Sequence, residues 1–403
     1  MNLTIYLYFL AAFLCAMGVG GVLFPRIILI SKRKRILDRP NGRKVHVSKI
    51  PRLGGFAFYP AILVSYWVMR GLFSMFDFNL PVLTVEEMLF FFAGITIIYY
   101  IGMADDIVGL PYRTKFLYQF LSAALLVLPL NYLADWQGIF GVHATPFWIG
   151  IPFTVLLIVA LINSYNLIDG VDGLCAGLSI FSIAMLSWVC VQMGSIYLAL
   201  LGVCSLGVLI VFFVFNVFGR RMKIFMGDSG SLLLGYLVAF LALELIVGMQ
   251  QHRTPDYVNV VSILGVVFVP LADMSRVFIQ RLLHGTSPFK PDKRHIHHKL
   301  LQLGLSHLQC TLLLILIQAL FAIANFWMAT RVNVNIALLI DFAAVALLIL
   351  FLNWRISCRE AVGCNFTQLQ VSVYDVKRLS LPLLTELSYA NVPFITGLAA
   401  PIS

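Results

Sequence analysis

Long apolar runs separated by short polar segments cover most of this chain. About eleven of these runs are long enough, at roughly 18 to 25 residues, to cross a bilayer as helices. They lie near residues 3–31, 53–73, 86–104, 113–131, 147–165, 173–192, 195–217, 230–249, 257–280, 308–329 and 333–353. The pattern predicts an all-α, polytopic integral membrane protein.

The charges between the runs predict how the spans are oriented. The first loop, Ser31–Arg52, carries nine Lys and Arg residues against one acidic residue, Asp38, so we expect it in the cytoplasm and the amino terminus outside. Alternation then places the motif-bearing loops and the carboxyl terminus in the cytoplasm. The opposite loops hold only Arg70, Arg253 and Arg331. Because the spans follow from hydropathy alone, this asymmetry supports their number independently.

The composition excludes a soluble globular protein. Hydrophobic residues make up 61% of the 403 residues and charged residues only 11%, and the mean hydropathy is +0.94. The seven cysteines are scattered, mostly in apolar runs, and none forms a C-x-x-C pair. Neither a disulfide framework nor a zinc cluster is therefore indicated. No nucleic-acid partner is expected.

A single multi-span membrane domain is expected over residues 1–353, because no internal repeat and no low-complexity tract is visible. Residues 354–403 mix apolar and polar positions without a clear period, and we expect a cytoplasmic tail of unknown role there. Residues 3–30 are expected to be a retained span rather than a signal peptide. This run is too long, lacks a basic n-region and ends in Lys32-Arg-Lys-Arg35.

The first polar motif ends the third predicted span. Asp105 and Asp106 are adjacent there, and two carboxylates at a membrane edge repel each other unless a cation offsets them. Mg²⁺ is the natural candidate, and the alternative is a solvated pair at a helix end. Arg113 and Lys115 follow and offer positive charge to a phosphate, although such residues also anchor spans at the membrane interface.

The second motif, Asn163–Leu174, joins two apolar runs. It holds two amides, Asn163 and Asn166, two carboxylates, Asp169 and Asp172, and two glycines within eleven residues. Capping of the next helix would need one such polar residue, not four. Since glycines also permit tight turns and close ligand approach, the motif favours a binding site.

The third motif, Phe225-Met-Gly-Asp-Ser-Gly-Ser231, precedes another apolar run. Its glycines and the N–H groups that start a helix suit an anion, and Asp228 offers oxygen to a hard cation. Gly-Asp-Ser-Gly also occurs around serine nucleophiles. That interpretation needs a histidine base beside Ser229, and the sequence shows no preorganised triad.

The fourth motif, Ser287–Lys299, contains His295, His297 and His298 among basic residues that include Arg294. Three imidazoles could bind a transition metal, but basic neighbours weaken cation binding and favour an anionic, phosphate-rich substrate. The alternative is a basic stretch that touches anionic lipids. It explains the charges but not the imidazoles.

In combination, these motifs resemble the polyprenyl-phosphate N-acetylhexosamine-1-phosphate transferases, the glycosyltransferase 4 family. The likeness covers about residues 30 to 310 and includes Arg43-Lys-Val-His46, Pro51-Arg-Leu-Gly-Gly55 and Pro270-Leu-Ala-Asp273. The H-x-H-H form of the fourth motif is similar to the branch that uses UDP-N-acetylglucosamine-type donors. The muramoyl-pentapeptide branch has H-H-H instead.

The resemblance implies an enzyme that transfers N-acetylhexosamine 1-phosphate, with N-acetylglucosamine favoured, from a UDP-sugar to undecaprenyl phosphate and releases UMP. It also implies Mg²⁺, with Mn²⁺ as a substitute, and an active site on the cytoplasmic face of the inner membrane. The residues agree with this chemistry. Two anionic phosphates must approach each other, and the lipid acceptor lies in the bilayer while the nucleotide is cytosolic.

The resemblance further implies a role for each site residue. The residues implied as metal ligands are Asn166 and Asp228. The catalytic pair on the lipid-phosphate side is Asp105 and Asp106. The uridine pocket is implied for Asp169, Asp172 and Phe225, with Asn216 beside it. Catalytic, phosphate or sugar contacts are implied for His295, His297, His298, Arg294 and Lys115.

Four further positions need separate treatment. Gly109 stands where some relatives continue to a third acid, D-D-x-x-D, which puts any mechanism that requires that acid in doubt. Glu244 and Asp341 lie inside apolar runs, where an ionisable group is by default a functional candidate. Their distance from the cytoplasmic motifs favours buried structural pairing or a place near the outer interface. Asp273 lies near the inner end of its span and is expected to support the site.

Other classes of function remain open on the sequence. A secondary transporter also has many spans, but its polar residues should gather near the bilayer midplane between repeated halves. A muramoyl-pentapeptide transferase-like activity and an intramembrane serine protease are further alternatives. The sequence identifies neither the hexosamine nor the glycan that receives it, whether O-antigen, wall teichoic acid, capsule or exopolysaccharide. It also leaves the oligomeric state open, with a homodimer as one option.

Overall fold

The computed structural model describes residues 3–34, 50–75, 85–129, 132–251, 255–287 and 294–361. Two compact units divide the chain, Met1–Ile356 and Ser357–Ser403, and the helical body belongs to the first. Three segments with predictions lie outside the described residues: the tail after residue 361, the Arg43-Lys-Val-His46 signature, and residues 288–293 of the fourth motif.

Helices make up almost all of the described residues. The α-helices are α1 (Leu3–Arg33), α2 (Phe58–Met75), α3 (Val85–Val108), α4 (Tyr112–Val127), α5 (Phe147–Leu167), α6 (Leu174–Gln192), α7 (Ile196–Phe213), α8 (Asp228–Gln251), α9 (Val260–Val266), α10 (Phe268–Leu283), α11 (Ile296–Gln302), α12 (His307–Met328) and α13 (Val334–Ala361). A 3-10 turn, η1, covers Gly54–Ala57, and a π-helical turn, η2, covers Val214–Phe218. No strand occurs among these residues, where a β-bridge joins Ile139 and Val142. The predicted all-α fold is confirmed.

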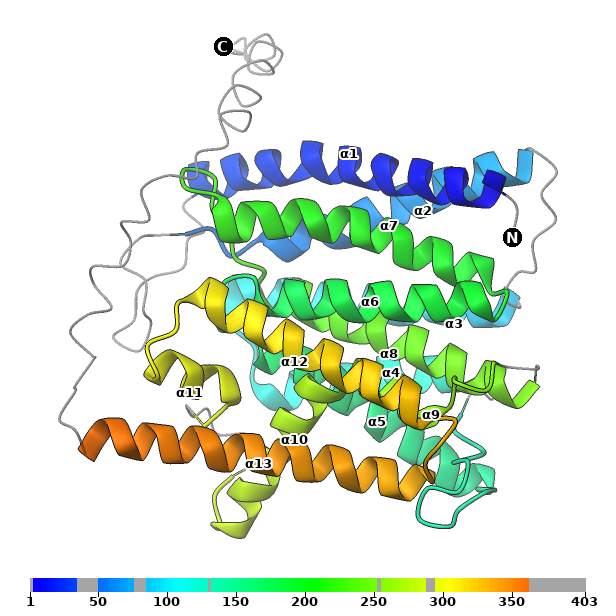
Figure 1. Cartoon of the computed structure of the whole chain (residues 1–403). Helices are drawn as coiled ribbons and strands as arrows, with labels where there is room; N and C mark the ends of the chain where they lie inside the picture. Colours follow the sequence, from blue (N-terminus) through cyan, green and yellow to red (C-terminus); the bar gives the residue numbers. More distant parts are fainter. Residues whose placement is uncertain are drawn as a thin grey trace, which may run out of the picture. The chain divides into compact units, whose positions relative to one another are not determined.

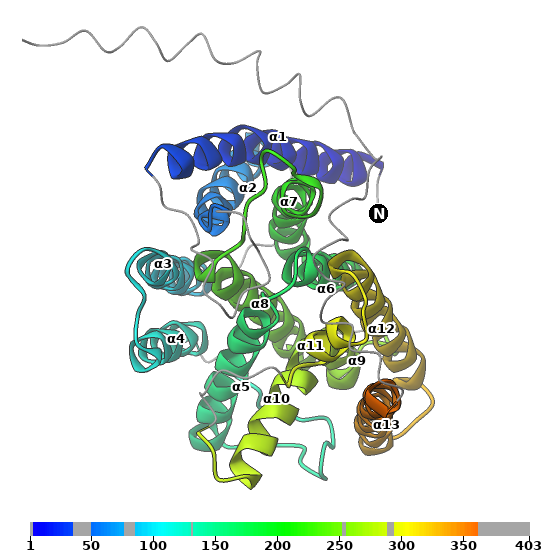
Figure 2. The same ribbon diagram turned by 90° about the vertical axis from the view of Figure 1, so that its left-hand side faces the viewer.

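The helix α8 is the central element of the helical body. Figure 1 shows that the axes of most of the long helices are roughly parallel. In the end view of Figure 2, α8 lies near the middle, with α1, α2 and α7 on one side and α5 and α10 on the opposite side. In the most apolar 18-residue stretch of α8, 83% of the residues are buried. A helix that is apolar on all sides is typical of such a surrounded position.

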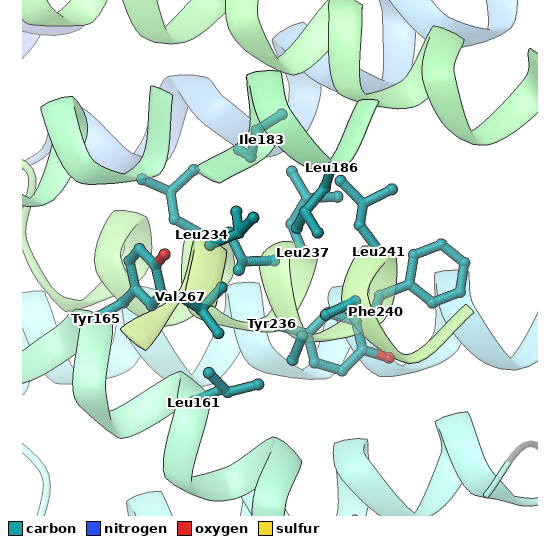
Figure 3. Close-up of a cluster of buried hydrophobic side chains, with 14 of the residues drawn as sticks. Leu161, Tyr165, Ile183, Leu186, Leu234, Tyr236, Leu237, Phe240, Leu241 and Val267 are labelled. Atoms are coloured by element: carbon teal, nitrogen blue, oxygen red, sulfur yellow. The ribbon is translucent and has the colours of Figure 1, made fainter. Parts of the chain in front are cut away.

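Apolar side chains pack closely around α8. Figure 3 shows Leu234, Leu237 and Leu241 of α8 beside Ile183 and Leu186 of α6. All five side chains are fully buried. Close packing of this kind, rather than exclusion from water, holds helices together in a bilayer. The packing therefore holds α8 in place, and the third motif ends in the first turn of this helix.

The structure supports a membrane protein with many spans. Among the described residues, nine helices are long and apolar enough to cross a membrane, or ten if α9 and α10, which meet at an 83° bend, form one broken span. Each predicted run coincides with a helix or with this bent pair. However, α4 has only 16 residues, fewer than the roughly 20 that a full span needs. The polytopic class is confirmed, whereas the count of eleven and the sides of the termini stay predictions.

One buried carboxylate pairs with a neighbouring helix. Asp341 of α13 is 2% exposed, and Nδ2 of Asn325 in α12 donates to its two oxygens at 3.1 and 2.9 Å. The structural pairing predicted for Asp341 is therefore confirmed. The pairing predicted for Glu244 stays a prediction.

Candidate active site

The first and third motifs meet where α3 ends and α8 begins. Asp106 of α3 accepts hydrogen bonds from the backbone N–H groups of Asp228 and Ser229, at 2.9 and 3.0 Å, and from the Ser229 hydroxyl at 2.6 Å. The first turn of a helix leaves such N–H groups without partners inside the helix. Asp106 therefore caps α8 from a neighbouring helix and fixes the position of Asp228.

Two glycines make this approach possible. Gly227 has a φ of +74°, in the left-handed region, and a Cβ there would lie only 2.6 Å from Oδ2 of Asp106. Gly102 of α3 faces the start of α8, where a Cβ would lie 2.5 Å from Cα of Ser229. Larger residues at either position would separate the first motif from the third.

Lys115 of α4 bridges two carboxylates of these motifs. Its Nζ lies 3.1 Å from Oδ2 of Asp105 and 2.7 Å from Oδ2 of Asp228. The other oxygen of Asp105 accepts the Leu110 N–H at 2.7 Å, which holds the loop after α3. The ammonium group of Lys115 thus lies between Asp105 and Asp228. The negative charges of these two acids stabilise a cation at this position.

The second motif reaches the same region from the end of α5. Asn166 donates from Nδ2 to Oγ of Ser231 in the first turn of α8, at 2.9 Å. One helical turn earlier, Asn163 donates to Oε1 of Gln119 in α4 at 2.5 Å. The end of α5 is therefore tied both to the helix that carries Asp228 and to the helix that carries the bridging lysine.

Asp169 lies close enough to the other acids to be affected by their charge. Its burial, together with the negative charges of Asp228 and Asp106, raises the pKa of Asp169 to about 8, although Arg52 acts in the opposite direction. Asp105 is the fourth acid in this region, beside Asp106, Asp169 and Asp228. Their negative charge exceeds the positive charge that Lys115 and Arg52 bring to it.

The donors in this region suit a hard divalent cation. They are carboxylate and amide oxygens, the ligands that Mg²⁺ prefers. Within the described ranges, no set of three or more His, Cys, Asp or Glu side chains is arranged to hold a metal ion. Of the predicted ligands, Asp228 begins α8 and Asn166 contacts Ser231 in the first turn of that helix. A metal ion there stays a prediction.

A second polar cluster surrounds Asp172. Oδ2 of Asp172 accepts from Nζ of Lys223 at 2.6 Å and lies 3.0 Å from Nδ1 of His307, the first residue of α12. Burial alone would raise the pKa of Asp172, but the bonds to His307 and Lys223 lower it below its ordinary value. Lys223 Nζ also lies 5.9 Å from the centroid of the Phe225 ring. Two residues predicted to bind uridine are thus joined through Lys223.

Asn216 uses both ends of its amide for backbone groups. Oδ1 accepts the Gly173 N–H at 2.5 Å, and Nδ2 donates to the Ile224 carbonyl at 2.7 Å. The side chain is buried and lies in the π-helical turn η2, a feature that often occurs near functional sites. Asn216 therefore joins the second motif to the third. Its direct contact with a substrate stays a prediction.

The fourth motif is oriented by Asp273 of α10. Oδ2 of Asp273 lies 2.9 Å from Nδ1 of His295, and the same carboxylate accepts the Ile296 N–H and, at 2.8 Å, an N–H of Arg276. Arg276 also donates to the Arg294 carbonyl at 2.6 Å. Asp273 thus supports the histidines, as its place in the sequence predicts.

His297 is the most deeply buried of the three histidines. Its ring is parallel to that of His295, with centroids 5.6 Å apart, and lies 4.2 Å from that of His298. Burial and then the neighbouring His298 lower the pKa of His297 to about 3, so its ring is neutral near pH 7. A Cβ on Gly170 would lie 3.4 Å from Nε2 of His297, which shows that the fourth motif meets the second.

The end of the first loop and the turn η1 support the third motif. Phe225 donates its N–H to the Pro51 carbonyl at 2.8 Å, and the Gly54 N–H donates to the Phe225 carbonyl at 2.9 Å. The Gly55 N–H donates to the Met226 carbonyl at 2.8 Å. These bonds on both sides hold the Phe225 backbone in place.

The four motifs therefore form one polar region at one end of α3, α5 and α8. The contacts above include or adjoin all of the predicted site residues, but no contact with a substrate tests their roles. Lys223, His307 and Arg276 also belong to this region and carry no sequence signal except proximity to a motif. A separate apolar hollow between α5, α8 and α9 contains none of these side chains.

Comparisons with known proteins agree with this arrangement. The sequence model of glycosyl transferase family 4 matches residues 88–246, which include the first three motifs. A Bacillus subtilis protein named probable undecaprenyl-phosphate N-acetylglucosaminyl 1-phosphate transferase is 30% identical over 321 residues, 78% of this chain and 83% of its own. The Escherichia coli K12 undecaprenyl-phosphate alpha-N-acetylglucosaminyl 1-phosphate transferase is 31% identical over 299 residues, 73% and 76% of the two chains. A Yersinia pestis protein of the same name is 30% identical over 297 residues, 71% and 75%.

Proposed function

Because the chain belongs to glycosyl transferase family 4, we propose that it transfers N-acetylglucosamine 1-phosphate from UDP-N-acetylglucosamine to undecaprenyl phosphate. The names of the relatives supply the acceptor and the transferred group. The observation that carries the proposal is the meeting of Asp105, Asp106, Asn166, Asp228 and Lys115 around the first turn of α8. Acids and an ammonium group in one place suit a reaction between two phosphates, which depends on positioning and electrostatics.

In this reaction an oxygen of the lipid phosphate attacks the β-phosphorus of the UDP-sugar. A bond forms between these two atoms, and the bond from the β-phosphorus to the oxygen that it shares with the α-phosphorus breaks. The products are undecaprenyl diphospho-N-acetylglucosamine and UMP, which keeps the shared oxygen and the electron pair. Since a phosphate monoester is largely ionised near pH 7, the attacking oxygen needs no dedicated base.

The acids around α8 would bind a metal ion and keep it in place. Asn166 and Asp228 would hold Mg²⁺, or Mn²⁺ in its stead, with Asp105 beside them. Such an ion supplies positive charge that offsets the repulsion between the two substrates. Lys115 neutralises two of these acids and has a flexible side chain that can turn to a phosphate. Asp106 bonds to the backbone of α8, so we assign it a positioning role.

The other motifs would bind the rest of the UDP-sugar. Phe225 and Asp172 would receive the uracil base, since a ring supplies a stacking face and a carboxylate accepts an N–H. Asp169 has a pKa near 8 and can therefore donate or accept a hydrogen bond with a ribose hydroxyl. The histidines and Arg294 offer N–H donors for the diphosphate and the sugar.

The active site would face the cytoplasm at the inner membrane. The nucleotide sugar is present there, while the polyprenyl chain stays in the bilayer. The excess of Lys and Arg in the loops on the motif side supports this orientation.

The geometry gives less support to the alternatives. Ser229 is fully buried and its hydroxyl donates to Asp106, so it is not placed as the nucleophile of a protease. The polar motifs gather at the ends of α3, α5 and α8, whereas a transporter site is expected near the middle of its spans. Nothing in the site favours a muramoyl-pentapeptide donor.

The purified protein tests this proposal directly. With undecaprenyl phosphate, UDP-N-acetylglucosamine and Mg²⁺ it should release UMP and form the lipid diphospho-sugar. Donors that carry other N-acetylhexosamines, compared by mass spectrometry of the lipid product, would identify the preferred sugar. Absence of UMP release with every donor would reject the proposal.

A further inference from the structure

The segment after residue 294 contacts the second motif at two separate points. His297 lies beside Gly170, as described above, and His307 lies beside Asp172. His307 belongs to none of the four motifs and follows the last of them by eight residues. It is nevertheless the residue of α12 that contacts a carboxylate predicted to bind the nucleotide.

His307 can hold Asp172 in either tautomer of its ring. When Nδ1 carries the proton, it donates to Oδ2 of Asp172 across 3.0 Å. When Nδ1 carries no proton, it accepts a hydrogen bond from the backbone N–H of Asp172 at 3.3 Å. The ring therefore restricts the side chain of Asp172 in one tautomer and its backbone in the other.

The start of α12 is itself fixed in place. Ser306 caps the helix in a capping box with Gln309, so His307 is held at the first helical position. One turn further, the hydroxyl of Thr311 donates to the Asp172 carbonyl at 3.1 Å. Two residues on one face of α12 thus hold Asp172 from its side chain and from its carbonyl.

Lys223 and His307 both contact the same carboxylate oxygen of Asp172 and form no hydrogen bond with the other oxygen. Oδ2 bonds to Lys223 and His307, whereas Oδ1 has no hydrogen-bond partner in the part of the chain that the structure describes. Lys223 also lies near the Phe225 ring, so it contacts both the carboxylate and the ring. Lys223 offsets the negative charge of Asp172, which would otherwise repel a nucleotide diphosphate.

We propose that His307 is a positioning residue that orients Asp172 so that Oδ1 accepts the N3–H of uracil. This inference rests on the proposed function and concerns its nucleotide specificity. Uracil presents an N–H at this ring position, whereas cytosine presents a lone pair that a carboxylate repels. His307 thereby determines how strongly the site prefers uridine to cytidine nucleotides.

The test compares His307→Leu with the wild-type enzyme in two assays. In the first, the KM for UDP-N-acetylglucosamine should rise about tenfold while kcat changes less than about threefold, because the lost bond to a charged group affects binding. In the second, UMP and CMP compete with the donor, and the preference for UMP should fall about tenfold. Each preference is a ratio within one variant, so a reduced active fraction does not alter it.

Two further variants separate positioning from general damage. His307→Asn places an amide nitrogen close to the position of Nδ1 and should recover most of the UMP preference. His284→Leu is the matched control, since His284 is exposed, directly follows α10, and has its Nδ1 2.6 Å from the Gln280 carbonyl of that helix. This control should keep the wild-type KM and preference.

The assays distinguish failure of this inference from failure of the proposed function. If wild-type protein releases no UMP from any donor, the proposed function fails. If wild-type protein is active but His307→Leu keeps its KM and its UMP preference, the role of His307 is wrong. A fall in kcat alone, with an unchanged preference, would also overturn it, because that result indicates a purely structural role.

Discussion

Partly or fully buried carboxylates lie at the first turn of α8 and between α12 and α13, and these two regions differ in what surrounds each acid. At the first turn of α8, Asp105 and Asp228 share the ammonium of Lys115, and a third acid caps the helix. Between α12 and α13, Asp341 is paired with the amide of Asn325. An amide stabilises an isolated acid, whereas acids that crowd together raise one another's energy and need a cation. Crowding of like charge, rather than burial, therefore marks the functional region.

The largest effect is expected from removing one charge of the crowded group. Asp228→Asn keeps the shape of the side chain but weakens the bond to Lys115 and the proposed metal site. We expect the rate of UMP release to fall by about 10³-fold, the upper range for loss of one electrostatic contact at a reacting group. Initial rates at saturating substrate measure this effect. A loss of less than about tenfold would mean that Asp228 lies outside the reaction site.

Lys115→Met tests the cation in the same group. Without the ammonium, Asp105 and Asp228 face each other, so we expect a rate about 10²-fold lower. In the proposed metal site Lys115 would compete with the ion for these acids, so the Mg²⁺ concentration that gives half-maximal rate should fall at the same time. A titration of UMP release against Mg²⁺ measures both changes. A higher Mg²⁺ requirement would contradict the proposed place of the ion.

His297→Gln tests the electrostatics of the fourth motif through stability. Its pKa in the folded protein is about 3, below the ordinary value near 6.5, so only the unfolded chain takes up this proton between these pH values. Stability must therefore fall as the pH falls through that window, by about 2 kcal/mol at pH 5 from this group. Between pH 7 and 5, the thermal midpoint of His297→Gln should fall less than that of the wild type. The exposed His143 offers a matched control, since His143→Gln should follow the wild type.

The smallest effect is expected in the second region. Asp341→Asn leaves a polar side chain opposite Asn325 and changes no group at the start of α8. The rate of UMP release should therefore stay within about twofold of the wild type, while the thermal midpoint shifts by only a few degrees. A loss of activity comparable with that of Asp228→Asn, at an unchanged midpoint, would show that crowding does not distinguish the two regions.

Hydropathy was sufficient to locate the helices, and the motifs were sufficient to locate the polar region. The apolar runs near 173–192 and 230–249 correspond to α6 and α8 within two residues at each end. Shorter or interrupted elements were harder. The run near 113–131 gives the 16-residue α4, and the run near 257–280 gives α9 and α10 with a bend between them, because hydropathy reports apolarity and not direction.

The contacts that hold the site together could not be predicted in this way. Asp172 and His307 are 135 positions apart in the chain, and only the packing of α12 places them together. The capping of α8 by Asp106 depends on how closely α3 approaches, which no local pattern reports. Motifs thus identify the groups that take part, while long-range packing decides which of them support the others.

The fate of the β-phosphate of the donor tests the central claim most directly. With UDP-N-acetylglucosamine labelled in that phosphate, the account predicts that the label enters the lipid product as its second phosphate and that unlabelled UMP is released. Release of labelled UDP, which would mean transfer of the sugar alone, would contradict the account, as would the absence of any labelled lipid.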